Sequence, residues 1–150
     1  GSFRVLSGKK LPDQWKELKK KEEKESLSAK DGIVDFGKNA EDLKRYRYLL
    51  QTKRFPCKDG DTVTVRYSVK GKGLFAPGMY FYYDNVQGRY ILEHKRTTLN
   101  SPDKFTDMEI VFPVKNSPGK KFERFVPMFY AFPGTKLELK NVTVTIEHAK

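Results

Sequence analysis

The stretch Thr62-Val-Thr-Val-Arg-Tyr-Ser-Val-Lys70 alternates apolar and polar residues without interruption. Successive side chains of a β-strand point to opposite faces, so a period of two predicts a strand with one buried face. The side chains expected to face a core are Val63, Val65, Tyr67 and Val69. Those expected to face outward are Thr64, Arg66 and Ser68.

Other segments of the chain share this character and are separated by turn residues. They are 33–36, 44–55, 79–84, 89–97, 105–114, 122–132 and 135–147. Segments 71–78 and 98–104, which contain glycine or proline, are expected to be loops. Many short strands in sequence predict an all-β fold, a two-sheet antiparallel β-sandwich with at most one short helix.

Two segments have a less regular pattern. In the last strand the apolar parity changes between Leu139 and Val142, which a β-bulge near Lys140-Asn141 would reconcile. The charged stretch 16–25 has two interpretations. Its composition favours a helix capped by Asp13, whereas an edge strand would use the lysines to discourage pairing with other chains.

Length and charge set broad limits. A chain of 150 residues is expected to form one domain over 1–150, with Gly1-Ser2 as a cloning remnant. The 30 Lys and Arg against 19 Asp and Glu give a net charge of +11, which suits either an acidic partner or a solubilising surface. No apolar run of membrane-spanning length is present. The single cysteine, Cys57, excludes an internal disulfide and is expected to be a structural thiol.

Three motifs resemble those of the jelly-roll carbohydrate-binding modules of the galactose-binding-like group, which are appended to bacterial glycoside hydrolases. They are Leu11-Pro-Asp-Gln-Trp15, the strand from Lys58 to Gly71, and the closing strand from Thr135 to Val144. The resemblance implies jelly-roll topology, an extended conformation for 16–25, and binding of a poly- or oligosaccharide. It also implies an extracellular or periplasmic location and a catalytic domain as a neighbour in a larger chain.

Many of these modules hold a structural calcium with an Asp in the closing strand and a Glu near the first strand. The corresponding positions here resemble Lys140 or Asn141 and Arg4. A lysine would repel a cation, so neither a metal nor any other cofactor is expected.

No catalytic constellation is visible in the sequence. His94 and His148 are the only histidines, and neither belongs to a zinc-binding spacing. We therefore expect a domain without enzymatic activity.

Aromatic residues are the candidates for binding. In Met79-Tyr-Phe-Tyr-Tyr83, Phe81 should lie on one sheet face, with Tyr80 and Tyr82 on the other. Outward rings could stack on the C–H faces of sugars, unless the N-terminal segment covers them. The candidate ligand-binding residues are Tyr80, Tyr82, Arg66, Arg89, Glu93, Tyr90 and Phe129. The net charge makes an anionic polysaccharide the first candidate ligand.

Two rival functions remain open at the level of sequence. A nucleic-acid-binding β domain would use the same basic groups on phosphates and the same rings on bases, but no named nucleic-acid motif is present. A structural accessory domain packed against a catalytic neighbour would need no ligand site. Exposure of the tyrosines separates this last function from carbohydrate binding.

Overall fold

The computed structural model describes residues 15–24, 26–37, 40–83 and 89–150, and these residues form strands joined by turns. The strands are β1 (Trp15–Leu18), β2 (Ser28–Lys30), β3 (Ile33–Asp35), β4 (Arg47–Gln51), β5 (Phe55–Pro56), β6 (Thr62–Tyr83), β7 (Tyr90–His94), β8 (Thr97–Pro113), β9 (Phe122–Ala131) and β10 (Lys136–Glu147). One turn of 3-10 helix, η1 (Asp42–Lys44), is the only helix in these residues. The all-β prediction is confirmed.

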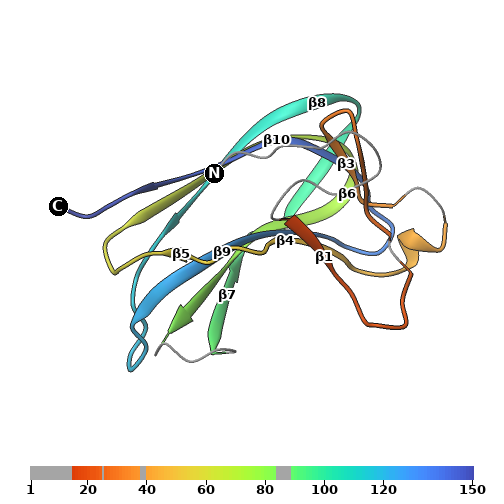
Figure 1. The fold of residues 1–150 in the computed structure, drawn as a ribbon. Helices are drawn as coiled ribbons and strands as arrows, with labels where there is room; N and C mark the ends of the chain where they lie inside the picture. The colour runs from red at the N-terminus through yellow and green to blue at the C-terminus, as the bar shows by residue number, and fades with distance from the viewer. Residues whose placement is uncertain (1–14, 25, 38–39, 84–88) are drawn as a thin grey trace.

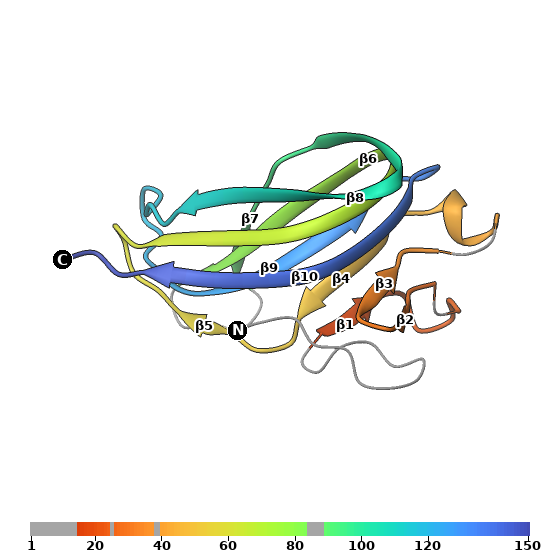
Figure 2. The same ribbon diagram turned by 90° about the horizontal axis from the view of Figure 1, so that it is seen from above.

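The strands form one continuous antiparallel sheet that curls into two layers, as Figure 1 shows. Strand β6 makes this possible because it runs through both layers. Its first half pairs with β8 and β10, and its second half pairs with β7 and β9. The first layer therefore contains β8, β6, β10, β3 and β2, and the second contains β7, β6, β9, β4 and β1, with β5 beside β9. Figure 2 shows β8, β6 and β10 side by side in the first layer. This is the sandwich of jelly-roll type that the sequence predicts.

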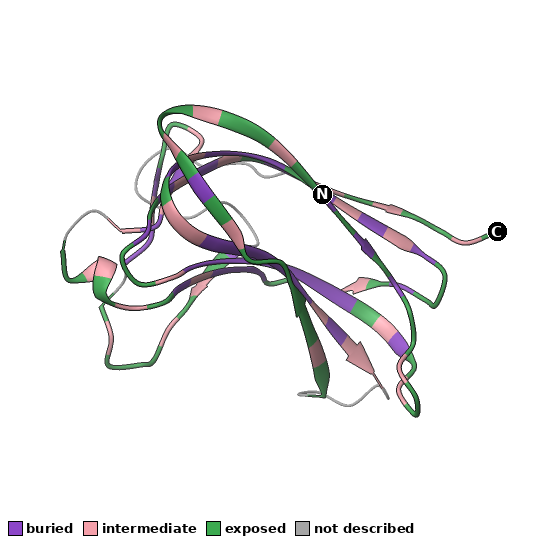
Figure 3. Cartoon of the chain, turned by 180° about the vertical axis from the view of Figure 1, so that it is seen from behind, coloured by how far each residue is buried: buried purple, intermediate pink, exposed green. Residues whose placement is uncertain are grey.

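The main core lies between the layers. The alternation in 62–70 has the predicted sense, since Val63, Val65, Tyr67 and Val69 are all buried. In the second layer Phe81, Phe125 and Phe129 point into the same core. Figure 3 shows buried residues along the strands of both layers, whereas β7 is mostly exposed or half-buried. Each large apolar side chain buried in this way stabilises the fold by about 1.5–3 kcal/mol.

The prediction of loops at 71–78 and 98–104 was wrong. The first segment is the middle of β6 and the second is the start of β8. Gly71 has φ 150°, and a Cβ there would lie 1.9 Å from the carbonyl oxygen of Lys136. The glycine therefore allows a close approach inside a bent strand rather than ending it. Pro102 lies where the register between β8 and β6 shifts, a position at which a strand tolerates proline.

The helical interpretation of 16–25 was also wrong, and the extended one implied by the resemblance is confirmed for Trp15–Leu18. Tertiary contacts decide the conformation of this short segment. Trp15 is buried with its ring 6.2 Å from that of Phe129, and the Glu17 carboxylate accepts hydrogen bonds from the Ser26 and Leu27 amides. The expectations for the motif at 11–14, including the cap at Asp13, for Arg4 and for an N-terminal cover concern residues outside those described.

The predicted bulge in β10 is confirmed. The register between β10 and β6 shifts between Lys140 and Thr143, and Asn141 adopts a positive φ of 54°. The extra residue lets Leu139 and Val142 both point into the core despite their different parity.

A buried carboxylate holds the C-terminal end of the chain against the turn before β6. Asp61 is 1% exposed and accepts hydrogen bonds from the Ala149 amide at 2.8 Å, the Lys58 amide at 3.0 Å and His148 Nδ1 at 3.0 Å. Burial alone would raise the pKa of this carboxyl, but the hydrogen bonds from Ala149, Lys58 and His148 outweigh burial and lower the pKa.

Asp61→Asn is expected to destabilise the domain at neutral pH much more than in acid. Because the pKa of Asp61 is lower in the folded state than its unfolded value of about 3.9, ionised Asp61 contributes stability above that value. This contribution is lost as the pH falls through the folded pKa. Thermal unfolding at about pH 7 and about pH 2.5 should show a wide gap in Tm between wild type and variant at the higher pH, and a narrow one at the lower. Asp103→Asn, at an exposed position, serves as the control. An equal difference in Tm between wild type and Asp61→Asn at both pH values would contradict this role of Asp61.

Candidate functional site

The outer face of the second layer carries a set of aromatic side chains from neighbouring strands. Tyr80 and Tyr82 point outward because Met79 and Phe81 point into the core, as predicted. Strands β4, β7 and β9, together with the residue before β4 and the residue after β9, add rings on the same side. We call this surface the tyrosine face, and its aromatic members are Tyr46, Tyr48, Tyr80, Tyr82, Tyr90, Tyr130 and Phe132.

The rings form two groups, and the rings within each group are in contact with one another. At the β6–β7 end, the Tyr90 ring lies 4.9 Å from that of Tyr80, edge to face, and 5.7 Å from that of Tyr82. At the β4–β9 end, the ring of Tyr130 lies 5.5 Å from that of Tyr48 and 5.1 Å from that of Phe132. Between the two groups lie smaller or flexible apolar side chains that are buried. These are Leu50, Ala76, Val126 and Met128.

The tyrosine face is open at its two ends. Tyr90 is 48% exposed and Tyr46 is 45% exposed. Tyr48, Tyr80 and Tyr82 are half-buried, and Tyr130 is buried. Among the residues that the structure describes, the aromatic strip is therefore partly accessible, with rings at both ends that a flat ligand could contact.

The polar groups of the tyrosine face are basic. The Arg54 guanidinium lies over the Tyr82 ring, 3.9 Å from its centroid, and that of Arg96 lies 5.4 Å from the Phe132 centroid. Arg124 is the register partner of Tyr82, and His94 Nδ1 shares a hydrogen bond with the Tyr130 hydroxyl. Within the described parts of β1, β4, β6 and β7, no outward position of this layer holds a carboxylate.

The Tyr80 hydroxyl keeps its proton over the physiological range. Burial raises the pKa of Tyr80 to about 12, and the neighbouring Tyr90 and Tyr82 add to the increase. A neutral phenol can donate a hydrogen bond to an oxygen of a ligand and accept one in return. The face thus combines apolar rings, neutral hydroxyls and fixed positive charge.

Three of the candidate residues predicted from sequence lie together here, namely Tyr80, Tyr82 and Tyr90. Arg89 directly precedes β7, where its carbonyl accepts a hydrogen bond from the Tyr83 amide. The remaining candidates do not join the face. Glu93 is paired in register with the core residue Met79, so it belongs to the opposite side of β7.

The structure places two further candidates, Phe129 and Arg66, away from the tyrosine face. Phe129 is 0% exposed and packs against Trp15 and Tyr67 in the core, so it presents no ring to solvent. Arg66 lies on the outer face of the first layer, where its Nε forms an ion pair with Glu109 at 2.7 Å. Grouping Arg66 with the tyrosines was wrong because β6 bends between Arg66 and Tyr80, and the two residues belong to different layers.

Sequence reasoning missed Arg54, Arg96, Arg124, His94 and the rings at the β4–β9 end as parts of one surface. A signal existed for part of it, since Tyr46, Tyr48 and Leu50 share one parity in 44–55. Their contact with Tyr130 depends on the pairing of β4 with β9, which no local pattern specifies.

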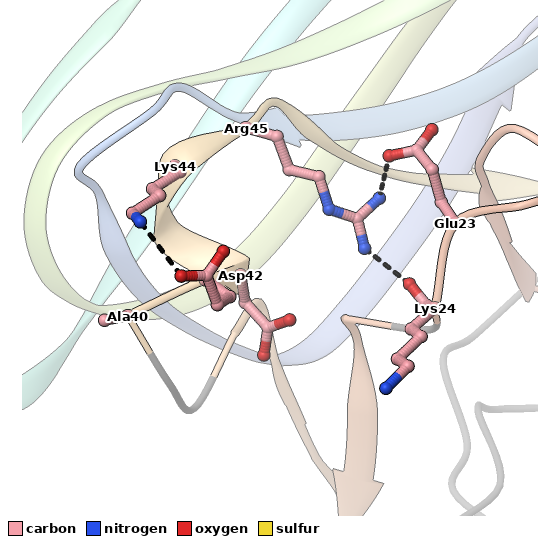
Figure 4. Close-up of a pocket in the computed structure, with 7 residues that line it drawn as sticks. Glu23, Lys24, Ala40, Asp42, Lys44 and Arg45 are labelled. Atoms are coloured by element: carbon pink, nitrogen blue, oxygen red, sulfur yellow. Dashed lines mark hydrogen bonds and ion pairs between the residues drawn. The ribbon is translucent and has the colours of Figure 1, made fainter.

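A pocket of about 730 Å³ lies elsewhere, beside η1, and Figure 4 shows its lining. Its charged groups largely satisfy one another. Lys44 Nζ lies 2.9 Å from Glu41, and the Arg45 guanidinium binds both the Glu23 carboxylate and the Lys24 carbonyl. The arrangement gives no set of side chains converging on a ligand.

The described residues include no activated thiol and no cluster of metal ligands. Cys57 is buried, and burial together with the charge of Asp61 raises the pKa of its thiol to about 12, so it is not an activated nucleophile. In the described ranges no group of three His, Cys, Asp or Glu side chains is placed to hold a metal ion. No helix in these ranges is long and apolar enough to cross a membrane.

Comparison with known proteins gives similarity at the level of structure. No protein-family model matches the sequence, and no curated protein does. The CBM22-2 xylan-binding domain of Paenibacillus barcinonensis Xyn10C superposes with a TM-score of 0.58 at 11% identity, over 89% of this chain and 91% of that domain. The family 11 carbohydrate-binding module of Clostridium thermocellum, in complex with a β-1,3-1,4-mixed-linked tetrasaccharide, gives 0.51 at 12% identity, over 95% and 94%. A cyclase from Fischerella sp. TAU gives 0.59 at 12% identity, over 95% and 89%.

At these identities the likeness shows the fold. The resemblance to jelly-roll carbohydrate-binding modules is confirmed at that level, whereas the galactose-binding-like grouping stays a prediction. Because both binding modules and a cyclase share the fold, function has to be argued from the side chains of the site.

Proposed function

We propose that this domain is a non-catalytic carbohydrate-binding module that holds an anionic polysaccharide on the tyrosine face. The observation that carries the proposal is a strip of aromatic rings across β4, β9, β6 and β7, flanked by basic groups. Carbohydrate-binding modules among the solved structures with this fold support it.

The rings suit a sugar because a pyranose presents an apolar C–H face. Placing that face on Tyr90 or Tyr46 would remove apolar surface from water on both partners. The neutral Tyr80 hydroxyl, close to Tyr90, would be available to hydroxyl groups at the rim of the sugar. A strip that spans four strands suits an extended chain better than a single monosaccharide.

The charges favour an anionic chain. Carboxylates and sulfates form charge-assisted, bidentate hydrogen bonds with guanidinium groups. Arg54 and Arg124 flank Tyr82, and Arg96 lies at the other end of the strip. A polysaccharide ligand implies an extracellular or periplasmic location and a catalytic domain elsewhere in a longer chain, and we include both in the proposal.

Affinity electrophoresis in gels containing polysaccharides tests the proposal. The panel should hold neutral polymers, such as xylan and mixed-linked glucan, and anionic ones, such as polygalacturonate, alginate and a sulfated glycan. We expect retention by at least one anionic polymer and weaker retention by neutral ones. Arg54→Gln with Arg124→Gln should remove most of that retention. Two changes on the first layer, Arg66→Gln with Lys115→Gln, alter the net charge equally and should preserve the retention.

Other results would replace the proposal. Binding of single-stranded nucleic acid with a steep salt dependence, and of no glycan, would favour the nucleic-acid function, since phosphate contacts release counterions. Retention of no polymer at all would favour a structural accessory domain. Equal losses in the two double variants would show that net charge, and not the tyrosine face, causes retention.

A further inference from the structure

A second basic surface lies on the opposite side of the molecule, on the outer face of the first layer. A cleft of about 510 Å³ there is bordered by β6, β10 and the start of β8. Its lining includes Lys70, Lys72 and Lys136, and we call it the lysine cleft. We propose that the lysine cleft binds an oxyanion, such as a sulfate group, independently of the tyrosine face.

The sheet brings two like charges together at the lysine cleft. Lys72 and Lys136 are register partners on β6 and β10. Like charges directly opposite each other on neighbouring strands destabilise a sheet. Lysine on an edge strand would prevent unwanted pairing, but Lys72 lies on an inner strand, with Asn100 of β8 as its partner on the other side. An anion bound between the two ammonium groups would attract both of them and offset their mutual repulsion.

The two acidic groups of the lining, Glu138 and Asp35, have partners other than Lys72 and Lys136. The Glu138 carboxylate forms an ion pair with Lys70 at 3.1 Å. The Asp35 carboxylate accepts a hydrogen bond from the Gly37 amide at 2.9 Å. In the part of the chain that the structure describes, Lys72 and Lys136 have no ion pair with a carboxylate, so their charge remains available to a ligand.

The shape of the cleft and the residues around it also suit an oxyanion. Gly71 lets β6 and β10 approach closely, because a Cβ there would collide with the Lys136 backbone. Pro102 adds an apolar wall. Beside the cleft, the centroid of the Phe105 ring lies 4.0 Å from Lys140 Nζ and 5.0 Å from Lys70 Nζ, which adds one further ammonium group, that of Lys140, to this face. An oxyanion with several acceptor oxygens fits such a concentration of donors.

The test is a titration of the ¹⁵N-labelled domain with sodium sulfate, followed by amide chemical shifts, against sodium chloride at equal ionic strength. Sulfate should shift the amides of Gly71, Lys72 and Leu137. Lys72→Gln with Lys136→Gln should weaken sulfate binding about tenfold or more, as expected for the loss of charged hydrogen bonds. The variant should stay folded, because it removes a repulsion. Lys58→Gln with Lys115→Gln makes the same change in net charge at exposed sites away from the cleft, and should bind like the wild type.

A second arm distinguishes a free ion from a polymer-borne group. A sulfated polysaccharide is added to Tyr82→Ala, Tyr90→Ala protein, in which the tyrosine face is disabled. Shifts at Gly71 that disappear with Lys72→Gln and Lys136→Gln would assign the cleft to polymer-borne sulfate. Shifts with inorganic sulfate alone would assign it to a small ion. The proposal is overturned if sulfate shifts none of these amides, or if the Lys58 and Lys115 variant loses binding equally. Neither result would affect the tyrosine face, so the two proposals fail separately.

Discussion

Replacing Tyr82 and Tyr90 together by alanine is expected to lower the affinity for an anionic glycan about 100-fold, while the fold remains intact. Each ring should contribute about 1.5 kcal/mol through stacking and apolar contact, and two such contributions multiply the dissociation constant by about 100. Tyr90 is 48% exposed and Tyr82 is half-buried, so their removal leaves the main core unchanged. Isothermal titration calorimetry with the best polymer of the panel measures the effect.

Tyr83→Ala is the matched control for this experiment. Tyr83 follows Tyr82 on β6 but packs against the main core from the other side of the strand. Its replacement is expected to leave affinity within about twofold of the wild type, because it removes no ring from the tyrosine face. An equal loss in the control, or an unchanged affinity in the double variant, would contradict stacking on this face.

Arg47→Met is expected to lower the free energy of unfolding by about 3–5 kcal/mol, the largest stability effect that we predict. Arg47 is 1% exposed, and its guanidinium donates hydrogen bonds to the carbonyls of Thr135 at 2.8 Å and Phe132 at 2.7 Å, and to that of Phe36. It thereby joins the end of β3, the start of β4 and the β9–β10 turn. Methionine would fill part of the volume but leave these buried carbonyls unpaired.

Urea denaturation at about 25 °C measures the loss. Arg66→Met is the control, because its ion pair with Glu109 is exposed and such pairs contribute about 0–1 kcal/mol. A loss below about 1 kcal/mol in Arg47→Met would show that water replaces the guanidinium at little cost.

The local pattern of apolar and polar residues predicted much of the fold. The alternation in 62–70, the opposite orientation of Phe81 and Tyr80, and the bulge near Asn141 all follow from a side-chain period of two, and the structure has each of them. These features depend only on which face of a strand a residue occupies, and the apolar pattern records that choice directly.

The errors arose where a distant part of the chain determines the structure. Gly71 and Gly73 look like loop residues, yet they let β6 bend past Lys136 and Thr135, more than sixty residues away in sequence. That bend also separates Arg66 from Tyr80. The basic members of the tyrosine face were missed for the same reason. Arg54 meets Tyr82 only because the fold brings the segment before β5 alongside the second half of β6.

The measurement that tests the central claim most directly maps the binding site of an oligosaccharide on the ¹⁵N-labelled domain, and this oligosaccharide is prepared from the anionic polymer that is retained best. The Lys72→Gln, Lys136→Gln variant should be used, so that the lysine cleft contributes nothing. We expect the amide shifts to concentrate in Arg47–Gln51, Tyr90–His94, Phe122–Ala131 and the second half of β6, the strands that carry the tyrosine face. Shifts concentrated instead on β8 and β10, or no shifts at any ligand concentration, would contradict carbohydrate binding on the tyrosine face.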